Sequence, residues 1–217
     1  MTNVYGTPEK TSMKTLLFRT AVRALEDSGY KVERVPGSGK SSVRRITKGK
    51  ESKVVSIRTS QDTWIAFPRM EDDKSWRTLD EIDAVVPVSV DDKHDPKVAR
   101  VHLVPGDEMR DRFNRAYKAR KDAGHSIPIG RGIWISLYNK EANDPVSHVG
   151  AGAGLKYPPI AEVPIESGAA LADDGDGEDE GPAVKDAAAP LTIAEAKRLL
   201  SISLGVDPAN IKIIVEG

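Results

Sequence analysis

Clustered cations are the residues of this sequence with the clearest chemistry. Between positions 31 and 58 the chain has nine Lys or Arg against two acids, Glu33 and Glu51. Clustered cations bind polyanions because each phosphate contact releases condensed counterions. The segment and the residues after it predict a nucleic-acid-binding surface with stacking contacts. Its candidate members are Lys40, Arg44, Arg45, Lys48, Lys50, Lys53, Arg58, Gln61, Trp64 and Arg69.

The expected strand geometry limits how these cations can combine. Arg44 and Arg45 are adjacent on one expected strand, so they point to opposite faces and only one joins any single patch. The alternative interpretation is a solvated sheet face with Trp64 in the core. A second cationic surface is expected on the helix after residue 107, through Arg110, Arg112, Arg115, Lys118, Arg120 and Lys121.

Other candidate motifs carry less chemistry. Gly37-Ser38-Gly39-Lys40-Ser41 is similar to a phosphate loop, but that motif needs glycine where Arg34 stands and a helix where Ser42 to Ile46 is strand-like. The histidines are too scattered for a paired ligand motif, so no metal site is predicted. They are His94, His102, His125 and His148.

Alternating and helical patterns indicate the elements that position these residues. Apolar residues recur every three or four positions from Ser12, which predicts a helix ending near Gly29. A second helix is expected from Glu108 to Ala123. Strands are expected over residues 30–35, 42–46, 54–58, 63–67, 82–90, 99–104 and 133–138. This order predicts an α+β fold with a central mixed β-sheet flanked by helices.

Composition divides the chain into four segments. We expect a flexible arm at 1–11, a core domain at 12–165, an acidic disordered linker at 166–190 and a helix–strand docking unit at 191–217. Residues 1–150 have 27 Lys and Arg against 21 Asp and Glu, whereas residues 151–217 have 5 against 12. Thr192 and Glu195 form a capping box, and the unit they begin is too small to bury a core alone.

The composition also suggests a compartment. The sequence has no cysteine, which excludes disulfides and thiolate chemistry. Its apolar runs are far shorter than the ~20 residues needed to cross a bilayer. We therefore expect a cytoplasmic protein without membrane association.

Part of the chain, residues 13 to 138, resembles the restriction-endonuclease-like PD-(D/E)XK superfamily. Residues 25–35 are similar to the end of the family's first helix and its following strand. Residues 54–60 are similar to the strand with the acid-x-lysine triplet, and residues 83–90 to a later core strand. The resemblance implies a nuclease-like fold and a DNA partner.

The chain departs from that family at the catalytic positions. The triplet is Ser56-Ile57-Arg58, and the preceding strand has Arg44 or Arg45 where an aspartate is expected. Metal-assisted hydrolysis needs carboxylates to hold the ion that activates water. The departures imply a degenerate active site with no cofactor. Glu33, Asp62 and Asp83 remain as remnant acids.

The leading hypothesis is a bacterial, non-catalytic DNA-binding protein that uses its basic β-hairpin face. One alternative is a protein-interaction adaptor that docks a partner or a second copy through residues 191–217. Another is a metal-dependent nuclease, with Mg²⁺ held by relocated ligands.

Overall fold

The structure, a computed structural model, describes residues 8–36, 42–128 and 130–165. The predicted linker at 166–190 and the predicted docking unit at 191–217 lie outside the described residues, as does Lys40. None of the helices in the described part of the chain combines the length and the apolar composition that crossing a bilayer requires.

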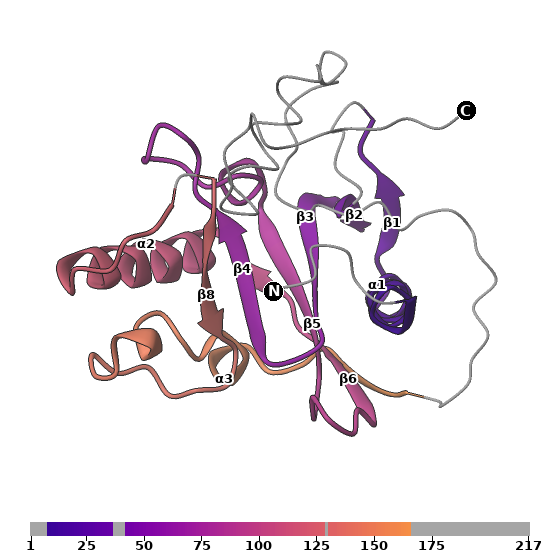
Figure 1. The fold of residues 1–217 in the computed structure, drawn as a ribbon. Helices are drawn as coiled ribbons and strands as arrows, with labels where there is room; N and C mark the ends of the chain where they lie inside the picture. Colours follow the sequence, from indigo (N-terminus) through magenta and orange to yellow (C-terminus); the bar gives the residue numbers. More distant parts are fainter. Residues whose placement is uncertain (1–7, 37–41, 129, 166–217) are drawn as a thin grey trace, which may run out of the picture. The chain divides into compact units, whose positions relative to one another are not determined.

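The predicted α+β class is confirmed by a mixed, strongly curled sheet of seven strands and three α-helices within the described residues (Figure 1). The helices are α1 (Pro8–Asp27), α2 (Gly106–Asp122) and α3 (Ala153–Lys156). The strands of the large sheet are β1 (Lys31–Arg34), β2 (Val43–Lys48), β3 (Glu51–Ser60), β5 (Ala84–Val90), β6 (Val98–Val101), β7 (Val104–Pro105) and β9 (Ala161–Pro164). A separate two-stranded sheet, the β4–β8 ribbon, contains β4 (Trp64–Pro68) and β8 (Gly132–Ser136). The 3-10 turns are η1 (Leu79–Glu81) and η2 (Val146–His148).

The large sheet has the order β1-β2-β3-β5-β6-β9, with β7 also paired to β5. Strands β1, β2 and β3 form an antiparallel meander, and β3 pairs with β5 in parallel. The connection between these parallel strands contains β4 and η1 rather than an α-helix. Strands β6 and β9 continue the sheet in the antiparallel sense.

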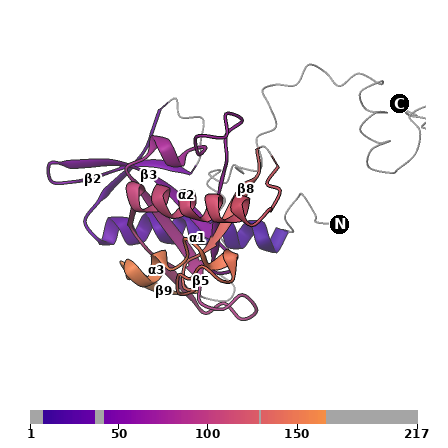
Figure 2. The same ribbon diagram turned by 90° about the vertical axis from the view of Figure 1, so that its left-hand side faces the viewer.

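Helix α1 covers one face of the large sheet (Figure 2). Its fully buried residues Leu17, Ala21 and Leu25 form the predicted apolar stripe. They share a hydrophobic cluster with Val55 of β3 and Val86 of β5, among others. Because side chains alternate along a strand, the odd-numbered positions of β3 face α1 and the even-numbered positions face away.

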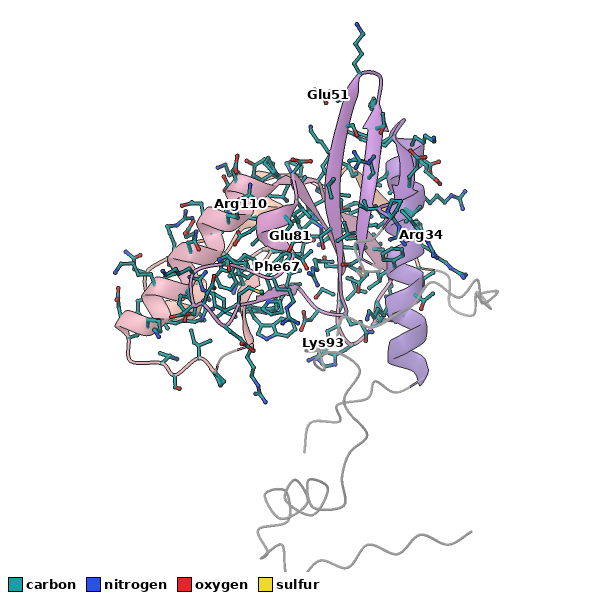
Figure 3. All side chains as sticks on the ribbon, turned by 90° about the horizontal axis from the view of Figure 1, so that it is seen from above. Arg34, Glu51, Phe67, Glu81, Lys93 and Arg110 are labelled. Atoms are coloured by element: carbon teal, nitrogen blue, oxygen red, sulfur yellow. The ribbon has the colours of Figure 1, made fainter. Side chains whose placement is uncertain are left out.

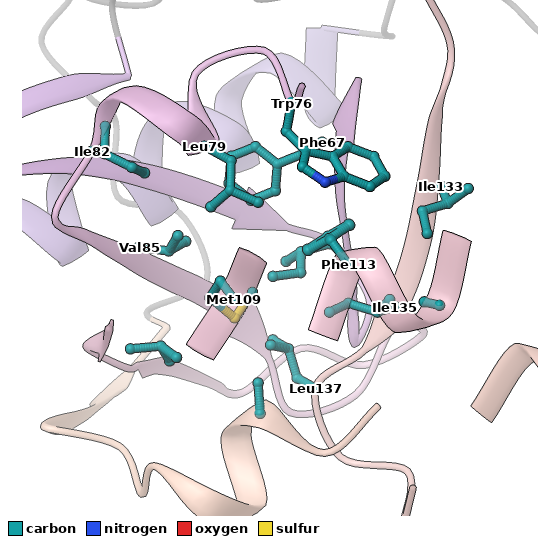
Figure 4. Packing of buried hydrophobic residues seen from close by; sticks show 14 residues of the cluster. Phe67, Trp76, Leu79, Ile82, Val85, Met109, Phe113, Ile133, Ile135 and Leu137 are labelled. Atoms are coloured by element: carbon teal, nitrogen blue, oxygen red, sulfur yellow. The ribbon is translucent and has the colours of Figure 1, made fainter. Parts of the chain in front are cut away.

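The opposite face packs against the β4–β8 ribbon and α2. Phe113 of α2 lies at the centre of this second cluster (Figure 4). Its ring meets Phe67 at a centroid distance of 5.2 Å and Trp76 at 5.3 Å, both edge to face. Such aromatic pairs stabilise packing beyond the area they bury, by about 0.5–1.5 kcal/mol each. They fix the ribbon and α2 to each other.

Pro87 does not place β5 at an edge, although a proline inside a strand favours an edge or a bulge. Strand β5 has partners on both sides, and β6 and β7 occupy one continuous antiparallel register along it. His102 lies between them and donates its backbone N–H to the Pro87 carbonyl at 2.9 Å. Pro87 has no backbone N–H, so it cannot donate a second hydrogen bond to the His102 carbonyl. The proline therefore interrupts its partner strand and leaves its own strand central.

Two segment predictions are wrong in detail. Helix α1 begins at Pro8 rather than at Ser12. Proline is favoured in the first turn of a helix because its missing N–H would have no intrahelical partner there. The stretch of residues 145–165, where no helix or strand is predicted above, contains η2, α3 and β9. Strand β9 forms through its pairing with β6, a long-range contact with no local signal.

Candidate nucleic-acid interface

The β2–β3 hairpin projects from the body of the described residues (Figure 3). Its strands pair from Val43 opposite Ser56 to Lys48 opposite Glu51, which leaves a two-residue turn. Gly49 in this turn has a φ of 60°, a conformation that glycine adopts readily. Pairing of β3 with β5 begins only at Val55, so the outer part of the hairpin extends beyond β5.

Four cations occupy the projecting part of the hairpin. Lys50 is exposed in the turn, and exposed Arg45 reaches only the Ser52 hydroxyl, at 3.4 Å. Lys48 donates to the backbone carbonyl of Ser28 at 2.8 Å. Lys53 lies 3.5 Å from Glu51. Three of the four thus have no acidic side chain as an ion-pair partner among the described residues, and each keeps its charge toward solvent.

The two adjacent arginines of β2 point to opposite faces, as strand geometry requires. Arg44 is 5% exposed on the α1 side. Its guanidinium lies 4.9 Å from the centre of the Phe18 ring, and its Nη1 donates to the Val43 carbonyl at 2.9 Å. Arg45 on the other face is exposed. Of the pair, Arg45 is the residue that a ligand can reach.

The remaining candidates lie outside the hairpin's projecting part. Arg58 of β3 stacks on the Phe67 ring at 4.4 Å. Gln61 and Trp64 are half-buried around the β3–β4 turn. The Arg69 side chain, 11% exposed, packs against the rings of Trp76 and Tyr117. The structure thus divides the predicted set between the hairpin and the neighbourhood of the ribbon.

The three candidate acids are each engaged in local structure. Glu33 pairs with Lys31 at 2.8 Å. Asp62 accepts hydrogen bonds from the Ser60 hydroxyl at 2.7 Å and from the Trp64 amide at 2.8 Å, which closes the β3–β4 turn. Asp83 accepts the Val54 amide at 2.7 Å where β5 begins beside β3.

The structure does not bring these acids to one point. Glu33 of β1 lies opposite Arg45 of β2, and Arg45 lies opposite Val54 of β3. The Val54 amide in turn donates a hydrogen bond to the Asp83 carboxylate. Glu33 and Asp83 are therefore three strand spacings apart, roughly 14 Å, whereas carboxylate oxygens bind a divalent ion at about 2.0–2.6 Å. In residues 8–36, 42–128 and 130–165, no three His, Cys, Asp or Glu side chains group as metal ligands.

The position of the acid-x-lysine triplet lies inside the sheet. Ser56 is fully buried, and its hydroxyl is 3.5 Å from that of Ser42 on β2. Arg58 lies on the same face of β3 and stacks on Phe67. The face that would present catalytic carboxylates in a nuclease presents a hydroxyl and a core-packed guanidinium.

The second cationic surface, on α2, is largely neutralised by acids. Arg110 and Arg112 pair with Asp107 and Glu108, Arg115 with Asp111 and Glu141, and Lys118 with Asp122. Lys121 lies 3.9 Å from Asp73. Arg120 is the exception, since it donates to the Ala116 and Trp134 carbonyls at 3.1 and 2.7 Å. Paired cations contribute less to a phosphate-binding field than unpaired ones.

Beside α2 the chain forms a shallow pocket around the Tyr117 hydroxyl, which donates to Asp73. That hydrogen bond, with the charges of Lys121 and Arg69, lowers the pKa of the Asp73 carboxyl. Its negative charge offsets the neighbouring cations and makes the pocket a weak anion site. The lining residues are Arg69, Met70, Asp73, Tyr117, Lys121, Ile127 and Pro128.

A buried network of polar groups joins β5, the connection between β6 and β7, and the segment after β8. The Tyr138 hydroxyl lies 2.8 Å from the Ser89 hydroxyl and 2.8 Å from Nε2 of His102. Nδ1 of His102 lies 2.7 Å from the Tyr157 carbonyl oxygen. Ser89 and His102 are fully buried.

The chemistry of these groups fixes their protons. The Tyr157 carbonyl can only accept, so Nδ1 of His102 carries a hydrogen. Burial lowers the pKa of His102 and favours the neutral ring, whose Nε2 is then an acceptor. Tyr138 donates to Nε2, and Ser89 donates to the Tyr138 oxygen. Because Ser89 and His102 are inaccessible to solvent, this hydrogen-bond network has a structural role and links three segments of the protein.

The sequence analysis did not predict this hydrogen-bond network or the exposure of Trp134 on β8, which is 59% exposed. The strict alternation Ile133-Trp134-Ile135 carries the signal, because both isoleucines are buried and the residue between them must face outward. In comparisons with known proteins, no family model, no curated protein and no solved structure matches the chain.

Proposed function

We propose that this chain is a non-catalytic DNA-binding protein whose β2–β3 hairpin contacts the phosphate backbone. The observation that carries the proposal is the contrast between its two basic surfaces. On the projecting hairpin, Arg45, Lys48 and Lys50 have no acidic ion-pair partner among the described residues. On α2 nearly every cation has one.

The anchoring of the hairpin supports the same proposal. Lys48 stacks its ammonium 5.3 Å from the centre of the Tyr30 ring and donates to the carbonyl at the end of α1. Arg44 holds β2 against α1 through Phe18. These contacts hold β2 in place at Arg44 near its base and at Lys48 beside the turn, so that Arg45 and Lys50 lose less freedom when they bind phosphates.

The order of elements also supports a degenerate restriction-endonuclease-like fold. Helix α1, the β1–β2–β3 meander and the parallel partner β5 follow the sequence of elements that the resemblance implies. The connection from β3 to β5 runs through β4 and η1 and contains no α-helix. Under this proposal, the face with Ser56 and Arg58 holds no magnesium, and the chain binds DNA without cutting it.

The experiment that tests the proposal is a titration of labelled duplex DNA, followed by fluorescence anisotropy at several salt concentrations. Each phosphate contact contributes about 0.9 to the slope of log affinity against log salt. The double substitution Arg45→Gln and Lys50→Gln is expected to lower that slope by roughly 2. The matched control is Lys118→Gln, which removes an exposed but acid-paired cation of α2.

Two results would contradict the proposal. The first is an absence of binding by the full chain at low salt. The second is a slope that Lys118→Gln lowers as much as the hairpin substitutions do. Divalent-ion-dependent nicking that disappears in Asp83→Asn would instead support the nuclease alternative.

A further inference from the structure

The β4–β8 ribbon has one apolar face in the core and one face toward solvent. Ile65 and Phe67 of β4 and Ile133 and Ile135 of β8 are buried in the cluster around Phe113. The alternate positions of both strands lie on the other face, where Trp134 is exposed, Trp64 and Ala66 are half-buried, and Ser136 is fully buried.

The two tryptophans are neighbours on this outer face. Trp134 lies opposite Ala66, and Trp64 lies opposite Ser136, so the indoles occupy a diagonal pair of positions. Such diagonal neighbours are about 7–8 Å apart, within reach of aromatic side chains. The ribbon therefore places two indoles at neighbouring positions, with Trp134 exposed and Trp64 half-buried.

The hydrogen-bond pattern brings the side chains on this face closer together. Leu137 donates to the Thr63 carbonyl at 2.8 Å, which makes residues 63 and 137 a hydrogen-bonded pair. Pairs alternate along an antiparallel ladder, so Trp134 and Ala66 form a non-hydrogen-bonded pair, in which side chains are closer. The Trp134 carbonyl then points out of the ribbon, where Arg120 binds it at 2.7 Å.

Arg120 supplies a positive charge at the same place. Among the six cations of α2 from Arg110 to Lys121, it is the one for which the described residues supply no acidic partner. Its guanidinium has five N–H donors, and its bonds to the Ala116 and Trp134 carbonyls use two of them. The half-buried side chain has three further N–H donors.

We infer that the outer face of the β4–β8 ribbon binds unpaired bases of a single-stranded nucleic acid. Bases stack on Trp64 and Trp134, and Arg120 contacts the adjoining phosphate. Aromatic platforms flanked by unpaired cations suit this ligand, because every base has a π face and every linkage has a negative charge. This inference rests on the proposed function and adds to it a preference for DNA that contains an unpaired stretch.

The test compares two oligonucleotides of equal length and equal charge, an oligothymidine and its fully abasic counterpart. Binding is followed by intrinsic fluorescence of the full chain. Of its three tryptophans, Trp76 is 2% exposed and stays shielded, so quenching reports the ribbon. We expect oligothymidine to quench and to bind more tightly than the abasic strand. Trp134→Ala is expected to weaken oligothymidine binding about 5- to 150-fold and to leave abasic binding unchanged.

A matched control and a conservative variant separate stacking from folding. Leu155→Ala removes another exposed apolar side chain, 54% exposed, and is expected to change neither affinity. Trp134→Phe keeps an aromatic ring and is expected to retain part of the oligothymidine affinity. Both variants are checked for native unfolding midpoints.

Three results are decisive against the inference. If wild-type protein binds the abasic strand as tightly as oligothymidine, or if Trp134→Ala leaves oligothymidine binding unchanged, the ribbon does not stack bases. If Trp134→Ala changes the oligomeric state alone, the face is an interface between proteins. In all three cases salt-dependent duplex binding through the hairpin would survive. Failure of the proposed function has a different signature, the loss of binding to every DNA at low salt.

Discussion

Removing a single oxygen atom tests the buried network of Ser89, Tyr138 and His102. Tyr138→Phe deletes the hydroxyl that lies 2.8 Å from both partners while it keeps the ring. Nε2 of His102 and the Ser89 hydroxyl, both in fully buried residues, then lose a partner. Each buried polar group left unsatisfied costs about 1–3 kcal/mol. The expected loss in the free energy of unfolding is therefore about 2–6 kcal/mol.

The assay is urea unfolding followed by far-ultraviolet circular dichroism, with the slope m compared between variants. Ser89→Ala supplies a sharper second test, because its effect depends on Tyr138. In the wild-type background it removes a donor and is expected to cost about 0.5–1.5 kcal/mol. In the Tyr138→Phe background it removes an unsatisfied hydroxyl and is expected to be neutral or stabilising. A Tyr138→Phe loss below about 0.5 kcal/mol, or equal Ser89→Ala costs in both backgrounds, would refute the reasoning.

Two further predictions concern pH and a glycine. Because burial lowers the pKa of His102, only the unfolded chain binds the His102 proton just below pH ~6.5. Lowering the pH through this range should therefore decrease the free energy of unfolding, by at most about 1.4 kcal/mol per pH unit. His102→Asn should remove this dependence, and an unchanged pH profile between pH 5 and 6.5 would contradict it. Gly150 has a φ of 79°, and a Cβ added there would lie 2.4 Å from the Arg112 carbonyl oxygen. Gly124 has a similar φ of 78°, but a Cβ added there would meet nothing within 4 Å. Gly150→Ala should therefore cost about 2–5 kcal/mol and Gly124→Ala about 1–2 kcal/mol in urea unfolding, and equal costs would contradict the close approach.

Much of the fold follows from local patterns. The stripe on α1 buries Leu17, Ala21 and Leu25, and the alternating segments form β1 to β6 close to their expected positions. Strand β9 could not be predicted in this way. It is four residues long, half-exposed and ends at a proline, and its strand character comes from pairing with β6 about sixty residues earlier.

The candidate site could be predicted only in part, because burial depends on tertiary contacts. Alternation shows that Arg44 and Arg45 diverge, but the position of Phe18 on α1 decides which of them is buried. Similarly, nothing in the sequence indicates that Arg58 stacks on Phe67 from the next strand. The hairpin cations, in contrast, follow from the sequence, because a short turn and few apolar residues keep them in solvent.

Lysine footprinting tests the central claim most directly. The full chain is acetylated briefly with and without duplex DNA, and the rate at each lysine is measured by mass spectrometry. We predict that DNA slows modification of Lys50 and Lys53 at low salt, that high salt removes this protection, and that Lys118 on α2 reacts equally in both samples. Protection of Lys118 with unchanged rates at Lys50 and Lys53 would contradict binding through the hairpin.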